Sequence, residues 1–343
     1  MMYKRSWVIM NNSFGRFVLP INPIYADRIE INQDSDQSTT NMSDEEMYGN
    51  YCRIIESDEQ WSEIITHYGY HGYVRSYCLK KLDDEEYILS KKQRMMITFQ
   101  HKTDVLSAAS VRGVLLISLP AGAVLDISEI NEETGWATVN LCDGRIGYVR
   151  GHSLTPKLYN EGYLEESPQY VVDLLKENDR FSKGGNKNFN FQEFLDINYG
   201  GDENAFRQKL IDNSKFYLGL QYRWGGRSTD GIDCSGLVNM AYLLSGIQIF
   251  RDSRICNGFP LKRLSPEHYD GKMLCDDIRL GKIRVGDTIY FPGHVALYMG
   301  EWRYIHSTAY KLSCGVVINS LNSKDPDFRE DLFDMIYAAG GIR

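Results

Sequence analysis

Apolar and polar residues alternate through the first half of the chain, and the alternation is centred on two tryptophans, Trp61 and Trp136. Alternation with a period of two predicts strands, and the glycines that follow each tryptophan predict the turns between them. The two segments lie 136 − 61 = 75 residues apart, and both read W-x7-G-x2-G-Y-V-R-x3-L. A repeat of this kind predicts two copies of one small β unit.

Both copies resemble the bacterial SH3-like domain, whose signature runs from a tryptophan strand through a glycine turn to a G-[YW]-V strand. The resemblance implies two small all-β barrels, one over residues 1–82 and the other over residues 90–157. Modules of this kind often bind peptides or wall polymers, but the fold alone does not establish such binding.

The first copy contains an acidic insertion. Residues 27–59 hold ten acidic and two basic residues and include the polar stretch NQDSDQSTTNMSDEE. Segments of this composition usually stay in solvent because they cannot bury enough apolar surface. We therefore expect a solvated loop, with a binding tail as the alternative.

A linker separates the repeat from the rest of the chain. Residues 158–202 are mostly polar, with an apolar-periodic piece at residues 170–176 and a Gly/Asn-rich stretch after it, which predicts a linker with one short helix. Apolar residues at helical spacing begin at Phe206, and Asp202 is positioned to cap that helix. Residues 203–343 are then a third domain.

The most informative chemical motif surrounds Cys234. The segment YRWGGRSTDGIDCSGLV is glycine-rich before the cysteine and has helical periodicity after it, so Cys234 is predicted at a helix start. The free N–H groups of a helix N-terminus favour a thiolate and are able to hold the oxyanion of an acyl-transfer intermediate. This setting indicates a reactive cysteine, and a buried structural cysteine is the alternative.

A cysteine nucleophile needs an imidazole base and a group that orients the base. His294 and His306 lie on two alternating segments joined by a turn at Gly300 and Glu301, which predicts a hairpin with both rings at one end. His294 would then be the base, and His306 would fix its tautomer. A Cys-His-His zinc site is the competing use of these residues, but the ligand-pair spacing of zinc sites is missing.

Four motifs together resemble the NlpC-type cell-wall cysteine peptidases, a papain-like α+β family. They are Y-x-W-G-G-x-S-x-x-G, D-C-S-G-L-V, G-H-V-A-L-Y and I-H-S, in that order. A Thr-Asp pair stands before the nucleophile where the family commonly has Ser-Pro, which leaves the shape of that loop open. The resemblance implies a peptidase without metal or organic cofactor, and its nucleophile, base, third polar residue and oxyanion-side tyrosine fall on Cys234, His294, His306 and Tyr222.

Two SH3-like units before such a peptidase resemble the γ-D-glutamyl-L-diamino acid endopeptidases. These enzymes hydrolyse the bond between D-Glu and the diamino acid in wall stem peptides that begin with a free L-Ala. In that subgroup an R-D-[SA] segment supplies an aspartate for the substrate's amine, and the first SH3-like unit lends a tyrosine to the same pocket. The corresponding substrate-binding residues here are Arg251, Asp252 and Ser253, and the flanking Asp233 and Ser235. Tyr70 is the preferred tyrosine of the first copy, with Tyr68 as the alternative, because neither is repeated in the second copy. Trp224 is expected either to line the pocket or to belong to the core.

Net charge limits the classes of binding partner, and the cysteines indicate the cellular compartment. The formal net charge is 38 − 46 = −8, which disfavours nucleic acid and anionic membranes as partners, and no apolar run is long enough to span a bilayer. Seven cysteines without a C-x-x-C pair suit a reducing compartment, and no secretory signal is recognisable. We therefore expect a cytoplasmic enzyme that recycles wall peptides.

Three other functions remain open from the sequence. One is a secreted wall-remodelling hydrolase anchored by its SH3-like domains. A second, from another class, is a non-catalytic wall-peptide-binding protein. The third is amidase or acyltransferase chemistry on the same papain-like core.

Overall fold

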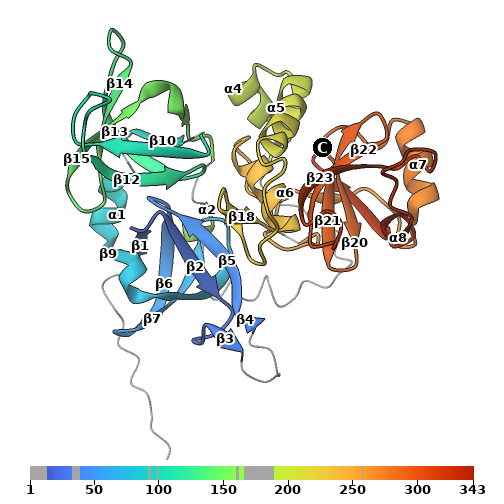
Figure 1. Cartoon of the computed structure of the whole chain (residues 1–343), viewed down its shortest axis with the longest axis horizontal. Helices are drawn as coiled ribbons and strands as arrows, with labels where there is room; N and C mark the ends of the chain where they lie inside the picture. Colours follow the sequence, from blue (N-terminus) through green and yellow to red (C-terminus); the bar gives the residue numbers. More distant parts are fainter. Residues whose placement is uncertain are drawn as a thin grey trace, which may run out of the picture.

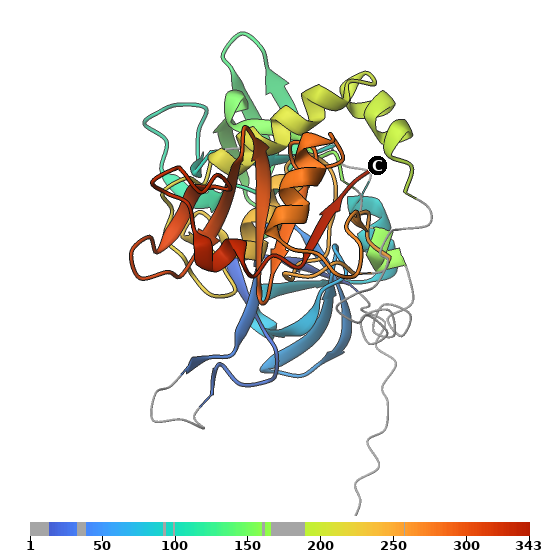
Figure 2. The same cartoon turned by 90° about the vertical axis from the view of Figure 1, so that its right-hand side faces the viewer.

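The computed structural model describes residues 14–32, 39–91, 94–98, 100–159, 162–165, 189–256 and 258–343. Two seven-stranded sheets precede a six-stranded sheet with helices beside it (Figure 1). In a view turned by 90°, the C-terminal sheet faces the viewer and the two N-terminal sheets lie behind it (Figure 2). The expected multidomain architecture, two small all-β units before an α+β domain, is confirmed.

The two N-terminal sheets, called here the first and second barrel, have the same topology. Their strand orders are β5-β2-β8-β7-β6-β1-β9 and β12-β11-β15-β14-β13-β10-β16, so every strand has an equivalent in the other barrel. In both barrels, the repeated arginine lies over the repeated tryptophan. The distance from the arginine Cζ to the ring centroid is 4.1 Å for Arg75 and Trp61 and 4.2 Å for Arg150 and Trp136. The predicted repeat is confirmed. The strands are β1 (Phe14–Phe17), β2 (Ile21–Tyr25), β5 (Met42–Met47), β6 (Tyr51–Ser57), β7 (Trp61–Thr66), β8 (His71–Arg75) and β9 (Leu79–Leu82), then β10 (Arg94–Thr98), β11 (Lys102–Leu106), β12 (Leu115–Pro120), β13 (Val124–Asn131), β14 (Trp136–Asn140), β15 (Ile146–Arg150) and β16 (Leu154–Pro156).

The acidic insertion is only partly a loop. Two short strands, β3 (Ile31–Asn32) and β4 (Thr39–Thr40), pair outside the barrel, but β5 is a strand of the barrel sheet itself. Asp44, Glu45 and Glu46 on β5 are at most 1% exposed. The expectation of a solvated loop is wrong for these three residues, because arginines of the third domain neutralise their charge.

Helices connect the barrels and the third domain. Helix α1 (Asp84–Ser90) follows the first barrel, and α2 (Gly162–Glu165) and α4 (Phe191–Tyr199) lie in the linker region. The helix expected at residues 170–176 falls outside the described residues. The next helix, α5 (Glu203–Lys215), begins as predicted, because the Asp202 side chain accepts hydrogen bonds from the backbone N–H groups of Asn204 and Ala205.

The third domain packs helices against an antiparallel sheet of order β19-β24-β20-β21-β22-β23. Helix α6 (Cys234–Leu243) has contacts with α5, β21 and β22, and all of its residues are buried. The remaining elements are β17 (Arg227–Ser228), β18 (Gly231–Ile232), β19 (Lys262–Arg263), α7 (Gly271–Arg279), β20 (Thr288–Phe291), β21 (His294–Gly300), β22 (Arg303–Thr308), β23 (Gly315–Ser320), α8 (Glu330–Phe333) and β24 (Ala338–Gly341).

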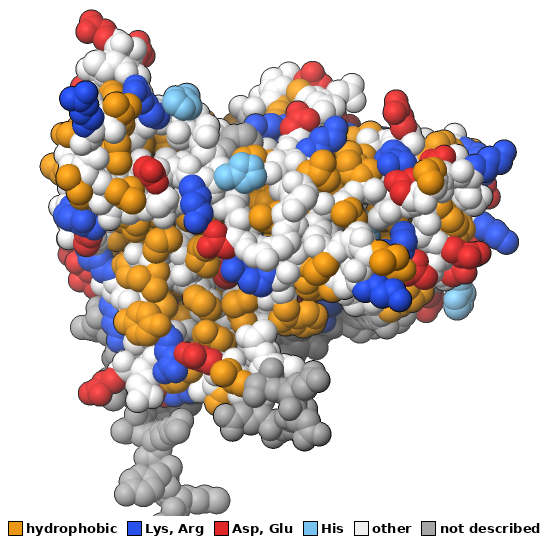
Figure 3. All heavy atoms as spheres, in the orientation of Figure 1, with side chains coloured by type: hydrophobic (Ala, Val, Ile, Leu, Met, Phe, Trp, Pro, Cys, Tyr) orange, Lys and Arg blue, Asp and Glu red, His pale blue; other side chains and the backbone are white. Residues whose placement is uncertain are grey.

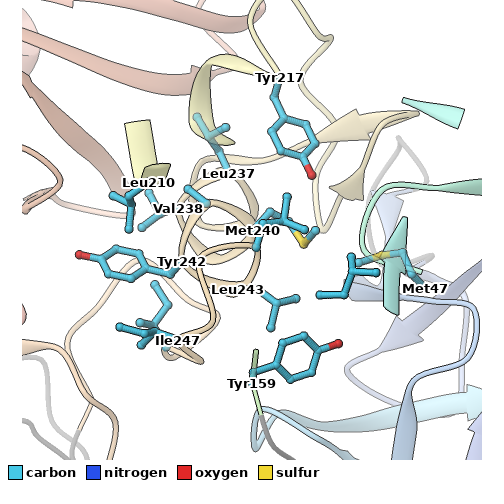
Figure 4. Close-up of a cluster of buried hydrophobic side chains, with 14 of the residues drawn as sticks. Met47, Tyr159, Leu210, Tyr217, Leu237, Val238, Met240, Tyr242, Leu243 and Ile247 are labelled. Atoms are coloured by element: carbon cyan, nitrogen blue, oxygen red, sulfur yellow. The ribbon is translucent and has the colours of Figure 1, made fainter. Parts of the chain in front are cut away.

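Helix α6 also contributes apolar contacts between the third domain and the two barrels. Figure 4 shows Met240 and Leu243 of α6 in one apolar cluster with Met47 of the first barrel and Tyr159 of the linker. In the second barrel, a Cβ on Gly122 would lie 2.8 Å from the Met240 side chain and 2.9 Å from that of Met47. Both barrels therefore pack behind the helix that begins at Cys234.

Candidate active site

The glycines before Cys234 permit a close backbone approach. A Cβ on Gly236 would lie 2.3 Å from the carbonyl oxygen of Gly226, and one on Gly226 would lie 2.4 Å from that of Gly231. Asp233 caps α6, since its Oδ1 accepts a 2.6 Å hydrogen bond from the Gly236 N–H. Its Oδ2 accepts a 3.0 Å bond from the Gly225 N–H. The glycine-rich loop is thus folded tightly over the start of α6, as the sequence predicted.

The Cys234 thiol is buried at this helix start. Burial raises its pKa to about 12, and the Asp233 carboxylate adds to this effect. The Val295 N–H, the Arg251 charge and the Ser235 N–H lower the pKa, but they do not outweigh burial. The thiol therefore needs a base to accept its proton.

The two predicted histidines are adjacent across the β21–β22 hairpin. The His294 Nε2 and His306 Nδ1 atoms are 2.7 Å apart, and the His306 Nε2 atom lies 2.9 Å from the Asn319 side-chain oxygen. Ser307 donates a 2.6 Å hydrogen bond to the Ile232 carbonyl, which holds β22 against the loop before Cys234. Because Nε2 of His294 contacts His306, Nδ1 is the ring nitrogen that the row of His294, His306 and Asn319 leaves open.

Burial keeps both imidazoles neutral. It lowers the pKa of His294 to about 3, with further contributions from His306 and the Arg329 charge. It lowers the pKa of His306 to about 4, although the hydrogen bond with Asn319 opposes the shift. A neutral His294 is able to accept a proton from the thiol.

A cleft of about 1110 Å³ opens beside Cys234 between the first barrel and the third domain. Tyr222, whose pKa is raised by burial and by the nearby Cys234, lines it together with Trp224, which is 63% exposed. Of the residues predicted from the sequence, the cleft is lined by Tyr70, Tyr222, Trp224, Asp233, Cys234, Ser235, Arg251, Asp252 and Ser253.

Tyr70 and Asp252 come from different domains and share one end of this cleft. Burial raises the pKa of Asp252, whereas the Arg251 and Arg254 charges lower it. Burial also raises the pKa of Tyr70; Asp252 is the next contributor, and a hydrogen bond with the Ser43 side chain opposes the rise. This end of the cleft thus combines a carboxyl group with a phenol and a hydroxyl group.

Arg251 differs from the other predicted residues because its donors are used inside the protein. Its Nε donates to Asp44 at 2.6 Å, and its Nη1 donates to Ser235 at 2.6 Å and to Asp233 at 3.0 Å. It is only 1% exposed. The guanidinium is therefore a bridge between the first barrel and the start of α6.

Several cleft and support residues were not predicted. Ser43, Met42, Arg254 and Tyr337 line the cleft. Asp44 holds Arg251, which also lines it, and Asn319 holds His306. The three consecutive acids on β5 are visible in the sequence, but such a density of charge usually predicts exposure to solvent. Asn319 belongs to no recognisable sequence motif. Only the pairing of β23 with β22 brings it beside His306.

A cysteine at a helix start, backed by an imidazole pair on the adjoining sheet, defines a cysteine peptidase site. The chain matches the NlpC/P60 family over residues 219–326. It is 32% identical over 302 residues to dipeptidyl-peptidase 6 of Lysinibacillus sphaericus, covering 87% of this chain and 91% of that protein. The chain belongs to the NlpC/P60 family of cysteine peptidases.

Similarity to Bacillus cereus is found both in sequence and in structure. The gamma-D-glutamyl-L-lysine dipeptidyl-peptidase is 34% identical over 116 residues, which cover 32% of this chain and 30% of that protein. The crystal structure of an NlpC/P60 family protein matches 95% of this chain and 98% of its own, with a TM-score of 0.62 and 17% identity. The latter supports the shared fold across all three domains.

The described residues hold neither a metal-binding cluster nor a membrane-spanning helix. Across the residues that the structure describes, no group of three or more His, Cys, Asp or Glu side chains is arranged to hold a metal ion. Within that same part of the chain, none of the helices combines the length and the apolar character needed to cross a bilayer.

Proposed function

We propose that this protein hydrolyses the bond between γ-D-Glu and the diamino acid in peptidoglycan stem peptides that begin with a free L-Ala. Two relatives are named dipeptidyl-peptidases, and one of these names specifies γ-D-glutamyl-L-lysine. Release of a dipeptide requires the enzyme to recognise a free amino terminus a fixed distance from the nucleophile.

The reaction follows from the chemistry of the site. His294 takes the proton of Cys234 as the sulfur attacks the amide carbonyl, and it then gives that proton to the leaving amine. His306, backed by Asn319, holds the reactive tautomer of His294. Tyr222 and the N–H groups at the start of α6 surround the oxyanion, and water then hydrolyses the thioester.

The end of the cleft with Asp252 and Tyr70 is the observation that carries the substrate proposal. A substrate ammonium is stable in a partly buried pocket only if a carboxylate pairs with it, and Asp252 is that carboxylate. Acetylation or attachment to a sugar removes the charge of the amine and adds bulk. The site would therefore accept released peptides and reject intact wall.

The test compares L-Ala-γ-D-Glu-L-Lys with its N-acetyl form and separates the products by mass. We expect L-Ala-γ-D-Glu only from the free peptide, and none from either with Cys234→Ala. Equal cleavage of both peptides would refute the amine pocket. Products of amide transfer instead of hydrolysis would favour the acyltransferase alternative.

We further propose that the enzyme acts on wall fragments inside the cell, because all seven cysteines are free thiols. A secreted hydrolase anchored to the wall by its barrels is the alternative. Sedimentation with purified sacculi separates the two, since a recycling enzyme stays in the supernatant. Co-sedimentation together with cleavage of sacculi would support the secreted enzyme.

A further inference from the structure

We propose that Asp44, on strand β5 of the first barrel, is a positioning residue for the nucleophile, because it anchors Arg251, which in turn clamps both neighbours of Cys234. This inference rests on the proposed role of Cys234. It makes the first barrel part of the catalytic apparatus rather than only a wall of the cleft.

Asp44 is not available to a ligand. Its side chain is fully buried, and it is not among the residues that line the cleft. One carboxylate oxygen accepts the 2.6 Å hydrogen bond from Arg251 Nε, and the other accepts a hydrogen bond from the Tyr68 hydroxyl. Both oxygens are therefore used to hold protein groups.

Arg251 transmits this anchor to the nucleophile. Its Nη1 contacts the Ser235 hydroxyl at 2.6 Å and Asp233 Oδ1 at 3.0 Å, while its Nη2 contacts Asp233 Oδ2 at 3.1 Å. These two partners are the residues directly before and after Cys234. The guanidinium thus fixes both sides of the sulfur, and Asp44 fixes the guanidinium.

The same row alternates in charge, from Asp44 through Arg251 to Asp233. Arg251 favours the Cys234 thiolate and Asp233 disfavours it, and Tyr222 is a further titratable group close to the thiol. His294, the proposed base, lies on β21, which packs against α6. Arg251 itself faces Asp44, Asp233, Tyr70 and Arg227. When Asp44 is replaced by a neutral residue, its negative charge no longer offsets the positive charge of Arg251. Arg251 then stabilises the Cys234 thiolate more strongly.

The test is Asp44→Asn in the full chain, with Glu46→Gln as the matched control. Glu46 is equally buried on the same strand, and it contacts Arg227 at 2.8 Å. We expect Asp44→Asn to lower kcat about tenfold with KM changed less than about twofold. We also expect the midpoint pH for iodoacetamide alkylation of Cys234, followed by mass spectrometry, to fall by about half a pH unit.

A simple structural role predicts a different result. If Asp44→Asn and Glu46→Gln lower the melting temperature alike and leave kcat and the alkylation midpoint at wild-type values, the proposal is wrong. Arg251→Lys tests the clamp from its other side, and a normal kcat in that variant would also overturn it. Because alkylation reads the thiol directly, this arm remains valid even if the substrate proposed above is not cleaved.

Discussion

The two barrels share a strand order and a tryptophan–arginine pair, yet only the first reaches the cleft. Strand β5 reads MSDEEM, whereas its equivalent β12 reads LLISLP. The acids of β5 meet buried arginines of the third domain, and residues of β12 such as Leu119 pack into an apolar core instead. Of the described residues that line the cleft, none comes from the second barrel.

The second barrel supports the site from behind. His101 stacks on Phe216 with ring centroids 4.1 Å apart, and its carbonyl oxygen accepts a 2.7 Å hydrogen bond from Thr229 in the loop before the nucleophile. A buried ion pair, Arg16 to Asp126 at 2.6 Å, joins the two barrels. Side chains coloured as hydrophobic are visible over both barrels in Figure 3. A repeated fold thus has two uses, determined by the residues that face the third domain.

The largest expected effect comes from removing the charges that distinguish β5 from β12. Replacing Asp44, Glu45 and Glu46 by their amides removes the carboxylates that pair with the buried Arg227 and leaves the buried Arg251 with Asp233 alone. We expect the free energy of unfolding in urea to fall by at least about 3 kcal/mol. Ser118→Ala, at the position of β12 equivalent to Glu45, should change it by less than about 1 kcal/mol. Equal losses would remove the distinction between the barrels.

The next effect is a loss of stability in acid that arises from the two buried histidines of the third domain. The pKa values of His294 and His306 are lowered to about 3 and about 4, so below pH 6.5 the unfolded chain binds protons that the folded chain does not. Stability should therefore fall as the pH drops from 6.5 to 5, by up to about 1.4 kcal/mol per pH unit for each ring. His306→Gln should flatten the slope of unfolding free energy against pH; an unchanged slope would contradict the burial of neutral rings.

A smaller effect concerns the turns that join equivalent strands. Tyr70 of the first barrel aligns with the exposed Arg145 of the second, which pairs with Asp143. Removing the hydroxyl in Tyr70→Phe should raise KM for the free-amine peptide about tenfold, because a hydrogen bond at the amine end is lost. Arg145→Ala is the control and should leave KM as it is. The same KM for both variants would exclude Tyr70 from the amine pocket.

The smallest effect should be the same in both barrels. Arg75→Ala and Arg150→Ala each remove a guanidinium from the face of a tryptophan at nearly the same distance. We expect each to lower the free energy of unfolding by about 0.5–1 kcal/mol. A large loss in one barrel alone would show that the shared pair has separate roles.

Local pattern accounts for the parts of the fold that were predicted. Alternation around Trp61 and Trp136 predicted the repeated sheets, and the glycine-rich loop predicted the helix that begins at Cys234. The spacing of His294 and His306 predicted a hairpin, because both residues belong to one local unit. Alignment of the two copies left Tyr68 and Tyr70 as candidates for the cleft, since only Tyr73 repeats, as Tyr148; of the two candidates, Tyr70 lines the cleft.

The sequence by itself determined the three-domain order and the motif surrounding the nucleophile, because strands, helices and caps depend on neighbours along the chain. Only the tertiary structure decided the state of Asp44, Glu45 and Glu46, because a carboxylate is buried when an arginine from another domain meets it. It also decided the burial of Cys234, which raises the pKa of the thiol. Charge balance and desolvation depend on what lies across a domain boundary, and residues far apart in the sequence carry no local sign of that contact.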